Sequence, residues 1–326
     1  MIAVYIILLV VGFVALIKGA DWFVDGSSNI ARLLKVPGVI VGLTIVAMGT
    51  SAPELAVSIS AALAGSNEIA LSNVIGSNMF NLLVVLGCCA MIHKVPVDTV
   101  ILKRDFPICL LVTAFVAVMV GAGSVTNGLF GKAAMADEVG SASRVMGLIL
   151  LVVFVCYLIA LIRDAIRNPV QEDDAQKPFS VGKSILLILV GVALIVGGGQ
   201  AVVRSAKEIA TFAGMSETLI GLTIVAMGTS LPELVTSIVA AKKGETGMAV
   251  GNVVGSNLFN LMLILGTSAA IHPIGVNMAS VYDMLILVGI TAITYLFCFV
   301  DRSVKRIEGL ILVLIYVGSV VFAAVR

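Results

Sequence analysis

Long apolar stretches alternate with short polar connections along almost the whole chain. Ten of these stretches are about 18–25 residues long, the length that a helix needs to cross the hydrocarbon core of a bilayer. The pattern therefore predicts an all-α polytopic membrane protein with ten transmembrane helices. The predicted spans are approximately 2–20, 38–63, 69–92, 106–122, 146–165, 182–203, 217–241, 247–271, 282–299 and 308–325.

The composition supports this prediction and argues against a soluble globular domain or a nucleic-acid-binding protein. Hydrophobic residues make up 60% of the chain and charged residues 12%, against roughly 25% charged residues in a soluble globular domain. The net charge is +1 and no basic stripe is present, so nothing indicates nucleic-acid binding or an obligate protein partner beyond the lipid bilayer. The first apolar segment, Ile2–Ile17, follows no basic residue and precedes no clear cleavage site, so we expect a retained helix rather than a signal peptide.

The chain contains the same pattern twice. Gly42–Ile59 and Gly221–Ile238 differ at only three positions, and a constant offset of 179 residues aligns the two copies well beyond these segments. Each copy holds five apolar stretches, and an odd number makes the second copy enter the membrane from the opposite side. We therefore expect two inverted five-helix repeats. The predicted boundaries are 1–122 with 146–165 for the first repeat, 182–326 for the second, and 166–181 for the loop between them.

The distribution of Lys and Arg predicts the orientation. If the N-terminus lies outside, fifteen of these residues fall on the inner side of the membrane and five on the outer side. Positive residues accumulate in cytoplasmic loops. We therefore expect both termini outside and the 166–181 loop in the cytoplasm.

Each copy places a carboxylate inside an apolar segment. Glu54 and Glu233 follow Pro53 and Pro232, which lack an N–H group and crowd the carbonyl four residues earlier. We expect the helices to bend or open there and to free main-chain oxygens. A carboxylate at membrane depth is costly and marks a functional site by default, and paired Gly/Pro-interrupted segments indicate the substrate site of a transporter.

Further residues share the face of each Glu or recur in register with it, and all of them except two Ala carry oxygen in their side chains. Because His and Cys are missing from this set, it suits a hard cation such as Ca²⁺ or Na⁺ rather than a soft metal. Two alternatives are structural: a protonated Glu in a buried hydrogen bond, and Ser and Asn residues that serve helix packing. The candidates are Ala47, Thr50, Ser51, Glu54, Ser77 and Asn81 in the first copy and Ala226, Thr229, Ser230, Glu233, Ser256 and Asn260 in the second.

Other recurring residues have simpler interpretations. Asp105 and Asp283 lie at the starts of the fourth and ninth apolar stretches, so we expect each to cap a helix or to interact favourably with its dipole. Glycines in the first and sixth stretches give those helices smooth faces that suit either close packing or sliding. These glycines are Gly12, Gly19, Gly191 and Gly198.

Two doubled motifs carry a resemblance to a known family. They are Gly-Thr-Ser-Ala-Pro-Glu at 49–54 with Gly-Thr-Ser-Leu-Pro-Glu at 228–233, and Gly-Ser-Asn-Met-Phe-Asn at 76–81 with Gly-Ser-Asn-Leu-Phe-Asn at 255–260. The chain resembles the cation/calcium exchanger superfamily, close to its prokaryotic sodium/calcium exchanger branch, over essentially its whole length. The family's two alpha motifs correspond to 42–87 and 221–266.

The resemblance implies a secondary antiporter in a prokaryotic plasma (inner) membrane. Such a protein would exchange three Na⁺ for one Ca²⁺ by alternating access and without a cofactor. Helices one and six would slide across a core of the other eight. The family places Ca²⁺ at the positions of Glu54, Glu233, Thr50 and Thr229, and Na⁺ or auxiliary contacts at those of Ala47, Ser51, Ser77, Asn81, Ala226, Ser230, Ser256 and Asn260.

One departure from the family pattern limits this transfer. Asn260 stands where the potassium-dependent branch, and some prokaryotic relatives, carry Asp, so we expect K⁺ to be neither required nor transported.

The residues leave other functions open. The same Glu pair could exchange protons for Ca²⁺, and a cation channel could also be lined by deep Glu residues. An enzyme is the weakest alternative, because no nucleophile, His and carboxylate converge in the motifs.

Overall fold

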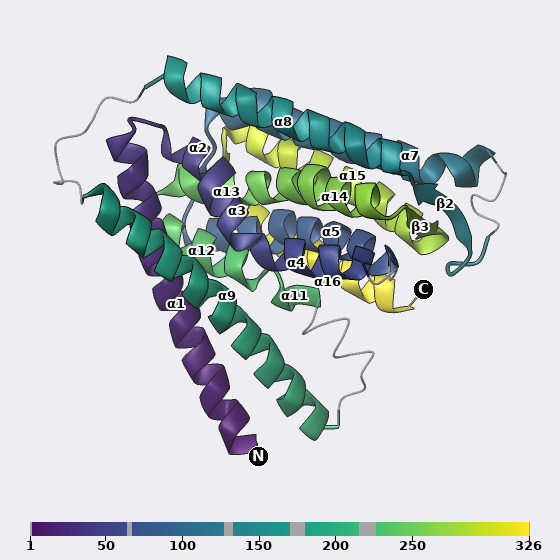
Figure 1. The fold of residues 1–326 in the computed structure, drawn as a ribbon, viewed down its shortest axis with the longest axis horizontal. Helices are drawn as coiled ribbons and strands as arrows, with labels where there is room; N and C mark the ends of the chain where they lie inside the picture. Colours follow the sequence, from purple (N-terminus) through teal and green to yellow (C-terminus); the bar gives the residue numbers. More distant parts are fainter. Residues whose placement is uncertain (1, 64–66, 127–132, 170–179, 215–225, 326) are drawn as a thin grey trace.

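The structure, a computed structural model, describes residues 2–63, 67–126, 133–169, 180–214 and 226–325. Almost all of these residues lie in helices (Figure 1). Within them, eight continuous helices are long and apolar enough to cross a membrane, and a further span is bent by 50° between Thr50 and Ala52. The protein is therefore an all-α integral membrane protein.

The first half runs from the N-terminus to residue 167. Three short stretches of the wider π-helix, η1, η2 and η3, continue directly into α-helices. The elements are α1 (Ile2–Leu33), α2 (Gly38–Val41), η1 (Gly42–Val46), α3 (Ala47–Thr50), α4 (Ala52–Leu63), α5 (Asn67–Phe80), η2 (Asn81–Val85), α6 (Leu86–Ile92), η3 (Ile101–Asp105), α7 (Phe106–Thr126) and α8 (Arg144–Arg167).

The second half repeats this order. The predicted span 217–241 begins in residues outside the described ranges, and its described part forms α11 and α12. The elements are α9 (Val181–Phe212), α11 (Ala226–Gly228), α12 (Leu231–Lys242), α13 (Thr246–Leu258), η5 (Phe259–Ile264), α14 (Leu265–Ile271), α15 (Met278–Asp301) and α16 (Arg306–Val325).

The helices α1 and α9 are longer than predicted from hydropathy. Each has 32 residues, because helix continues through the polar residues that follow the apolar stretch. In α1 these residues include Asp21 and Asp25, which form ion pairs with Lys243 after α12. The apolar length therefore marks the membrane-facing part of each helix and not its end.

Glycines allow α1 and α9 to touch through their backbones. The two helices run side by side away from the remaining bundle (Figure 1). A Cβ atom on Gly19 would lie 2.8 Å from the carbonyl oxygen of Gly191, and one on Gly198 would lie 2.7 Å from that of Gly12. Real Cβ atoms do not approach a backbone this closely, so the glycine faces are close-packing surfaces between these two helices.

Two short antiparallel strand pairs join the halves, and hydropathy did not predict them. β1 (Val95–Pro96) pairs with β4 (Ser303–Val304), and β2 (Glu138–Ala142) pairs with β3 (Ile274–Asn277). Strands this short carry too little periodicity to be recognised in a sequence. Each pair connects a loop of the first half with a loop of the second.

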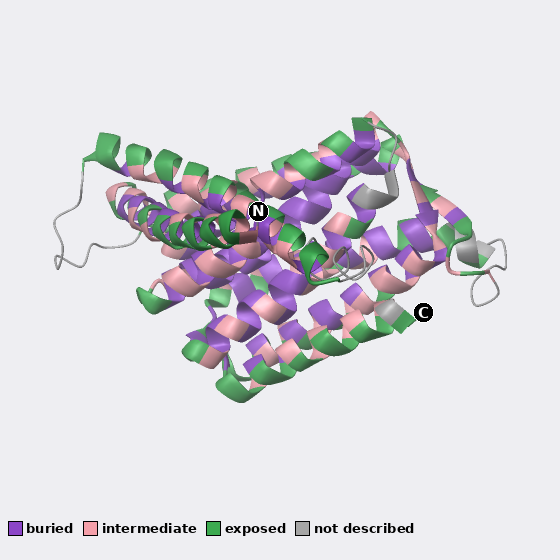
Figure 2. Cartoon of the chain, turned by 90° about the horizontal axis from the view of Figure 1, so that it is seen from below, coloured by how far each residue is buried: buried purple, intermediate pink, exposed green. Residues whose placement is uncertain are grey.

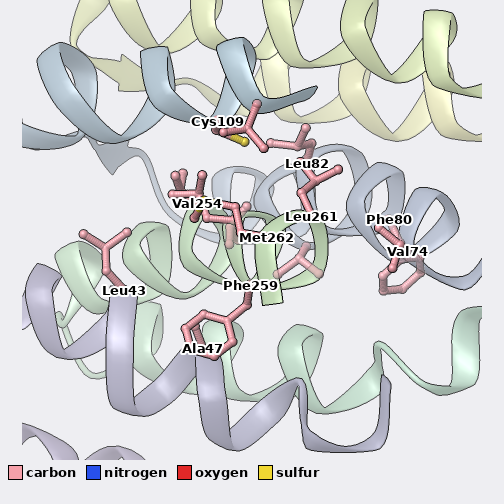
Figure 3. Packing of buried hydrophobic residues seen from close by; sticks show 14 of the residues in the cluster. Leu43, Ala47, Val74, Phe80, Leu82, Cys109, Val254, Phe259, Leu261 and Met262 are labelled. Carbon is pink, nitrogen blue, oxygen red and sulfur yellow. The ribbon is translucent and has the colours of Figure 1, made fainter. Parts of the chain in front are cut away.

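The core surrounds α13. Every residue of this helix from Met248 to Leu258 is buried, and exposed residues line the outer sides of the bundle (Figure 2). Val254, Leu261 and Met262 share a cluster with Cys109 of α7 (Figure 3). A helix that is buried all round provides a fixed platform for the residues beside it.

The two aspartates expected to cap helices do not do so. Asp105 lies within continuous helix at the junction of η3 and α7, where it is fully buried against Arg104 and Tyr157. Asp283 lies inside α15, whose N-cap is Asn277. The hydrophobic pattern placed both helix starts too late, because the first turns contain polar residues.

Candidate cation-binding site

Each copy of the Gly-Thr-Ser-x-Pro-Glu motif forms a break in a helix with a Glu in the turn that follows. Thr50 ends α3, Ser51 adopts φ −83° and ψ 9°, and Glu54 lies in the first turn of α4. In the second half, Ser230 has φ −94° and ψ 8°, and Glu233 lies in the first turn of α12. The first helix was predicted to bend here, and this prediction is confirmed.

The local chemistry accounts for the break. Pro53 and Pro232 have no N–H to donate to the carbonyls of Gly49 and Gly228, so the helical ladder is interrupted at that point. The Glu side chains consequently lie at the beginning of a helix, where the unpaired N–H groups and the helix dipole favour negative charge.

The two halves hold each other's carboxylates. Ser230 Oγ donates to Glu54 Oε1 at 3.1 Å, and Ser51 Oγ donates to Glu233 Oε1 at 2.8 Å. Both carboxylates are buried, with exposed fractions of 1% and 0%. This reciprocity brings two acidic groups, 179 positions apart in the repeat, into one site.

Each carboxylate has one oxygen that accepts no hydrogen bond from the described part of the chain. Glu54 Oε2 and Glu233 Oε2 have no hydrogen-bond partner among the described residues, and neither Glu forms an ion pair with a described Lys, Arg or His. Burying two carboxylates without positive charge is costly. The geometry therefore suits occupation by a cation or by protons.

The two Thr residues of the motifs are not equivalent. The hydroxyl of Thr50, which is fully buried, donates to Asn252 Oδ1 at 3.1 Å. The buried hydroxyl of Thr229 has no partner within the described ranges. Both remain candidate ligands, but only Thr50 has its hydroxyl fixed by the other half.

The serines of the next helices lie beside the same carboxylates. Ser77 of α5 approaches Glu54, and Ser256 of α13 approaches Glu233. Ser77 is 1% exposed and Ser256 is 0% exposed. The structure thus brings these predicted oxygens to the Glu pair.

The predicted Asn residues are buried in the π-helical stretches. Asn81 begins η2, which packs against α12, and its side-chain oxygen and nitrogen have no partner in the described part of the chain. Asn260 of η5 donates to Asn78 Oδ1 at 3.0 Å, and its own oxygen has no hydrogen-bond partner among the described residues. Ala47 is buried in α3. Ala226 lies in α11, and its side chain is outside the described part of the structure.

Sequence reasoning missed a pair of asparagines behind the carboxylates. Asn73 Nδ2 donates to Ser58 Oγ at 3.0 Å and to the main-chain oxygen of Glu54 at 3.4 Å. Asn252 Nδ2 makes the equivalent bonds to Ser237 Oγ at 2.9 Å and Glu233 O at 3.5 Å. The signal was present, because these residues also recur at the 179-residue offset.

The donor set consists of oxygen. No group of three or more His, Cys, Asp and Glu residues gathers anywhere in the described ranges. Carboxylate, hydroxyl and amide oxygens are ligands for hard cations, whereas thiolate and imidazole suit soft metals.

The sequence family agrees with this geometry. Residues 4–163 and 183–325 match the family described as "Sodium/calcium exchanger protein". The chain belongs to the sodium/calcium exchanger protein family. This membership confirms the resemblance seen in the doubled motifs.

Several relatives match this exchanger-family chain over nearly its full length. The putative antiporter CaxA of Alkalimonas amylolytica is 36% identical over 96% of each chain. The sodium/calcium exchanger MaX1 of Methanosarcina acetivorans is 33% identical, with coverage of 98% of this chain and 99% of the relative.

A solved exchanger has the same fold. The sodium–calcium exchanger NCX_Mj, in a structure that concerns extracellular ion exchange and binding-site occlusion, superposes with a TM-score of 0.83. It is 31% identical, and the match covers 98% of this chain and 99% of that chain. The exchanger fold therefore extends over the whole of the described structure.

Proposed function

We propose that this chain is a secondary antiporter that exchanges Na⁺ for Ca²⁺ by alternating access. The observation that supports it most strongly is the buried pair Glu54 and Glu233, each bound by a Ser of the opposite half and each with one oxygen free of partners among the described residues. Two carboxylates neutralise one Ca²⁺, which takes roughly six to eight oxygen ligands in flexible geometry.

Competition at this site provides the coupling. Glu54, Glu233, Thr50 and Thr229 bind Ca²⁺, and Na⁺ uses the surrounding oxygens. An empty site leaves two buried charges uncompensated, so the loaded forms change sides more readily than the empty form. The Na⁺ and auxiliary positions are Ala47, Ser51, Ser77, Asn81, Ala226, Ser230, Ser256 and Asn260.

The exchange is electrogenic and independent of K⁺. Three Na⁺ against one Ca²⁺ move one net charge, which is worth about 2.3 kcal/mol per 100 mV of membrane potential. Asn260 offers an amide rather than a third carboxylate, so the site lacks the additional charge that a further cation would require.

The two repeats, 1–122 with 146–165 and 182–326, form opposite halves of the transport path. Both termini lie outside and the 166–181 loop lies in the cytoplasm, as the Lys and Arg distribution indicates. A relative named an inner membrane protein, YrbG of Escherichia coli, is 36% identical over 82% of this chain and supports the assignment to a prokaryotic plasma membrane.

The decisive experiment is ⁴⁵Ca²⁺ uptake into proteoliposomes that contain the purified protein. Uptake that requires internal Na⁺, with K⁺ or choline loading inactive, is the expected result, and its rate should respond to an imposed potential. Uptake driven by a pH gradient without Na⁺ would replace the proposal with H⁺/Ca²⁺ exchange. Flux that needs neither gradient would indicate a channel.

Single substitutions test the site. Glu54→Gln and Glu233→Gln each keep the size of the side chain and remove a charge that Ca²⁺ needs, so each should abolish uptake. The control is Glu208→Gln, which changes an exposed carboxylate of α9 and should transport like the unmodified protein. Transport retained by both site variants would rule out the assignment.

A further inference from the structure

Asn252 occupies a junction between the two halves. Its amide nitrogen binds Ser237 Oγ at 2.9 Å and the main-chain oxygen of Glu233 at 3.5 Å. Its amide oxygen accepts from Thr50 at 3.1 Å and from Ser256 at 3.4 Å. The side chain is completely buried, so all of these bonds form away from water.

The contacts determine which way the amide faces. The carbonyl oxygen of Glu233 can only accept a hydrogen bond, so the nitrogen of Asn252 must lie on that side. The amide oxygen therefore faces the hydroxyls of Thr50 and Ser256. An oxygen in this position can accept a hydrogen bond from each hydroxyl.

A hydroxyl that binds a cation does so through its lone pairs, and its proton must go elsewhere. Thr50 has three acceptors for this hydrogen bond: Val46 O at 3.1 Å and Ala47 O at 3.4 Å, which belong to its own half, and Asn252 Oδ1 at 3.1 Å. Only the bond to Asn252 fixes the hydroxyl relative to the half that carries Glu233. The distance between a Thr50 ligand and a Glu233 ligand thus depends on Asn252.

The equivalent residue in the first half lacks this connection. Asn73 binds Ser58 and the main chain of Glu54, which belong to its own half. The hydroxyl of Thr229, which would be its partner by symmetry, has no hydrogen bond within the described ranges. Asn73 is also partly exposed, whereas Asn252 is not. Asn73 therefore serves as an internal control for the hydrogen bond between Asn252 and the opposite half.

We propose that Asn252 is a positioning residue for cation binding: its amide oxygen accepts the hydrogen bond of the Thr50 hydroxyl and so holds the lone pairs of Thr50 at the correct spacing from Glu233. This inference rests on the proposed cation site at Glu54 and Glu233. Replacement of residues that orient metal ligands typically lowers metal affinity by about 10- to 100-fold.

The test measures Ca²⁺ affinity of the purified full-length protein by calorimetry in Na⁺-free detergent solution, together with KM and kcat of ⁴⁵Ca²⁺ uptake. Asn252→Leu approximately keeps the volume of the side chain and removes the amide oxygen and nitrogen. It should raise Kd and KM by about 10- to 100-fold with a smaller change in kcat. Asn73→Leu removes only bonds within one half and should have a smaller effect. Asn252→Asp keeps the acceptor oxygen and should retain more affinity than Asn252→Leu.

A double-mutant cycle separates positioning from simple stability. If Asn252 acts through Thr50, Thr50→Val should weaken binding in the unmodified protein but change it by less than about twofold in the Asn252→Leu background. Asn252→Ser, which is too short to span the same partners, is the second variant if the Leu variant does not give a monodisperse protein.

The outcomes are distinguishable from failure of the proposed function. Independent effects of Thr50→Val and Asn252→Leu, equal losses in Asn73→Leu and Asn252→Leu, or an Asp variant as weak as the Leu variant would each overturn the inference. Coupled losses of Ca²⁺ affinity in a protein that shows no Na⁺-driven uptake would instead support the positioning role and contradict only sodium exchange.

Discussion

Individual buried charges have two different environments in this molecule. Asp105 is compensated, because Arg104 binds its carboxylate at 2.9 and 3.2 Å and the Tyr157 hydroxyl donates to it at 3.0 Å. Glu54 and Glu233 receive hydroxyl donors but no described cationic side chain. The first environment stabilises helices α7 and α8 against each other, and the second leaves charge for a ligand.

We expect substitutions among Asp105, Arg104 and Tyr157 to change the stability of the protein without a direct effect on the cation site. Arg104→Met should lower the free energy of unfolding by about 3–5 kcal/mol, because it leaves a buried carboxylate unpaired. The measurement is thermal unfolding in detergent. Adding Asp105→Leu should restore part of the loss, since both charges are then absent, and a double variant less stable than Arg104→Met would contradict the compensating role of Arg104.

At the same scale, the sequence singled out the two acidic residues of the candidate site but not the residues that contact them. Glu54 and Glu233 stood out because helix packing alone rarely accounts for a carboxylate in an apolar segment. Asn252 did not, because its partners Thr50 and Ser237 lie on other helices and an Asn in a membrane helix is equally suited to packing. Side-chain partners distant in the chain become visible only in three dimensions.

Among the elements, α1 and α9 form a unit of their own. Their backbones touch at Gly12, Gly19, Gly191 and Gly198, where no side chain separates them. Because backbone cannot move aside as a flexible side chain can, an added Cβ atom at this contact would force the two helices apart. The pair is therefore expected to move as one rigid body relative to the bundle.

One substitution tests this contact, with a control on the same helix. A Cβ on Gly191 would lie 2.8 Å from Gly19 O and from the backbone nitrogen of Phe23, whereas one on Gly197 would meet nothing within 4 Å. Gly191→Ala should destabilise the protein by about 1–3 kcal/mol through overpacking, and Gly197→Ala should not. Thermal unfolding of both variants is the measurement, and equal stability would contradict the packing assignment.

Hydropathy predicted the course of the helices more reliably than their ends. The break after Thr50 followed from Pro53, a local steric effect that sequence reveals directly. The extension of α1 through Asp21 and Asp25 depends on Lys243, which lies in the other half. The strand pairs likewise join distant loops, so no local pattern announced them.

Across the whole molecule, the inverted halves are alike but not identical. Lys243 lies 2.6 Å from Asp21 and 2.7 Å from Asp25, and these three residues form the α1–α12 ion-pair cluster. Partial burial lowers the pKa of Lys243, but the hydrogen bonds to both aspartates outweigh it and raise the pKa above its ordinary value. In the second half, Gln200 and Arg204 stand where symmetry places the two aspartates.

This asymmetry predicts a preference between the two faces of the transporter. The cluster holds α1 against the core at the end assigned to the cytoplasm, and each exposed ion pair contributes about 0.2–1 kcal/mol. Asp21→Asn with Asp25→Asn should therefore favour opening at that end and lower the Ca²⁺ KM on the cytoplasmic face relative to the opposite face. Uptake into oriented vesicles measures this ratio.

The control for this prediction is Asp301→Asn, which removes the partner of Lys305 at the end of α15. That pair does not involve α1, so the ratio of the two KM values should stay unchanged. The effect of the double aspartate variant should also disappear at high ionic strength, because salt screens exposed charges. An unchanged ratio at low salt would show that the cluster does not bias the conformation.

Energy conservation limits the effect that the α1–α12 ion-pair cluster can have on the direction of transport. Passive exchange is driven only by the ion gradients and the potential, so a fixed contact within the protein cannot make it run in a preferred direction at equilibrium. If the cluster changes the ratio of the half-saturation concentrations on the two faces, the ratio of the maximal rates in the two directions must change by the same factor. The three side chains can therefore make exchange faster in one direction than in the other under matched gradients. The calcium concentration reached at equilibrium would be the same with or without them.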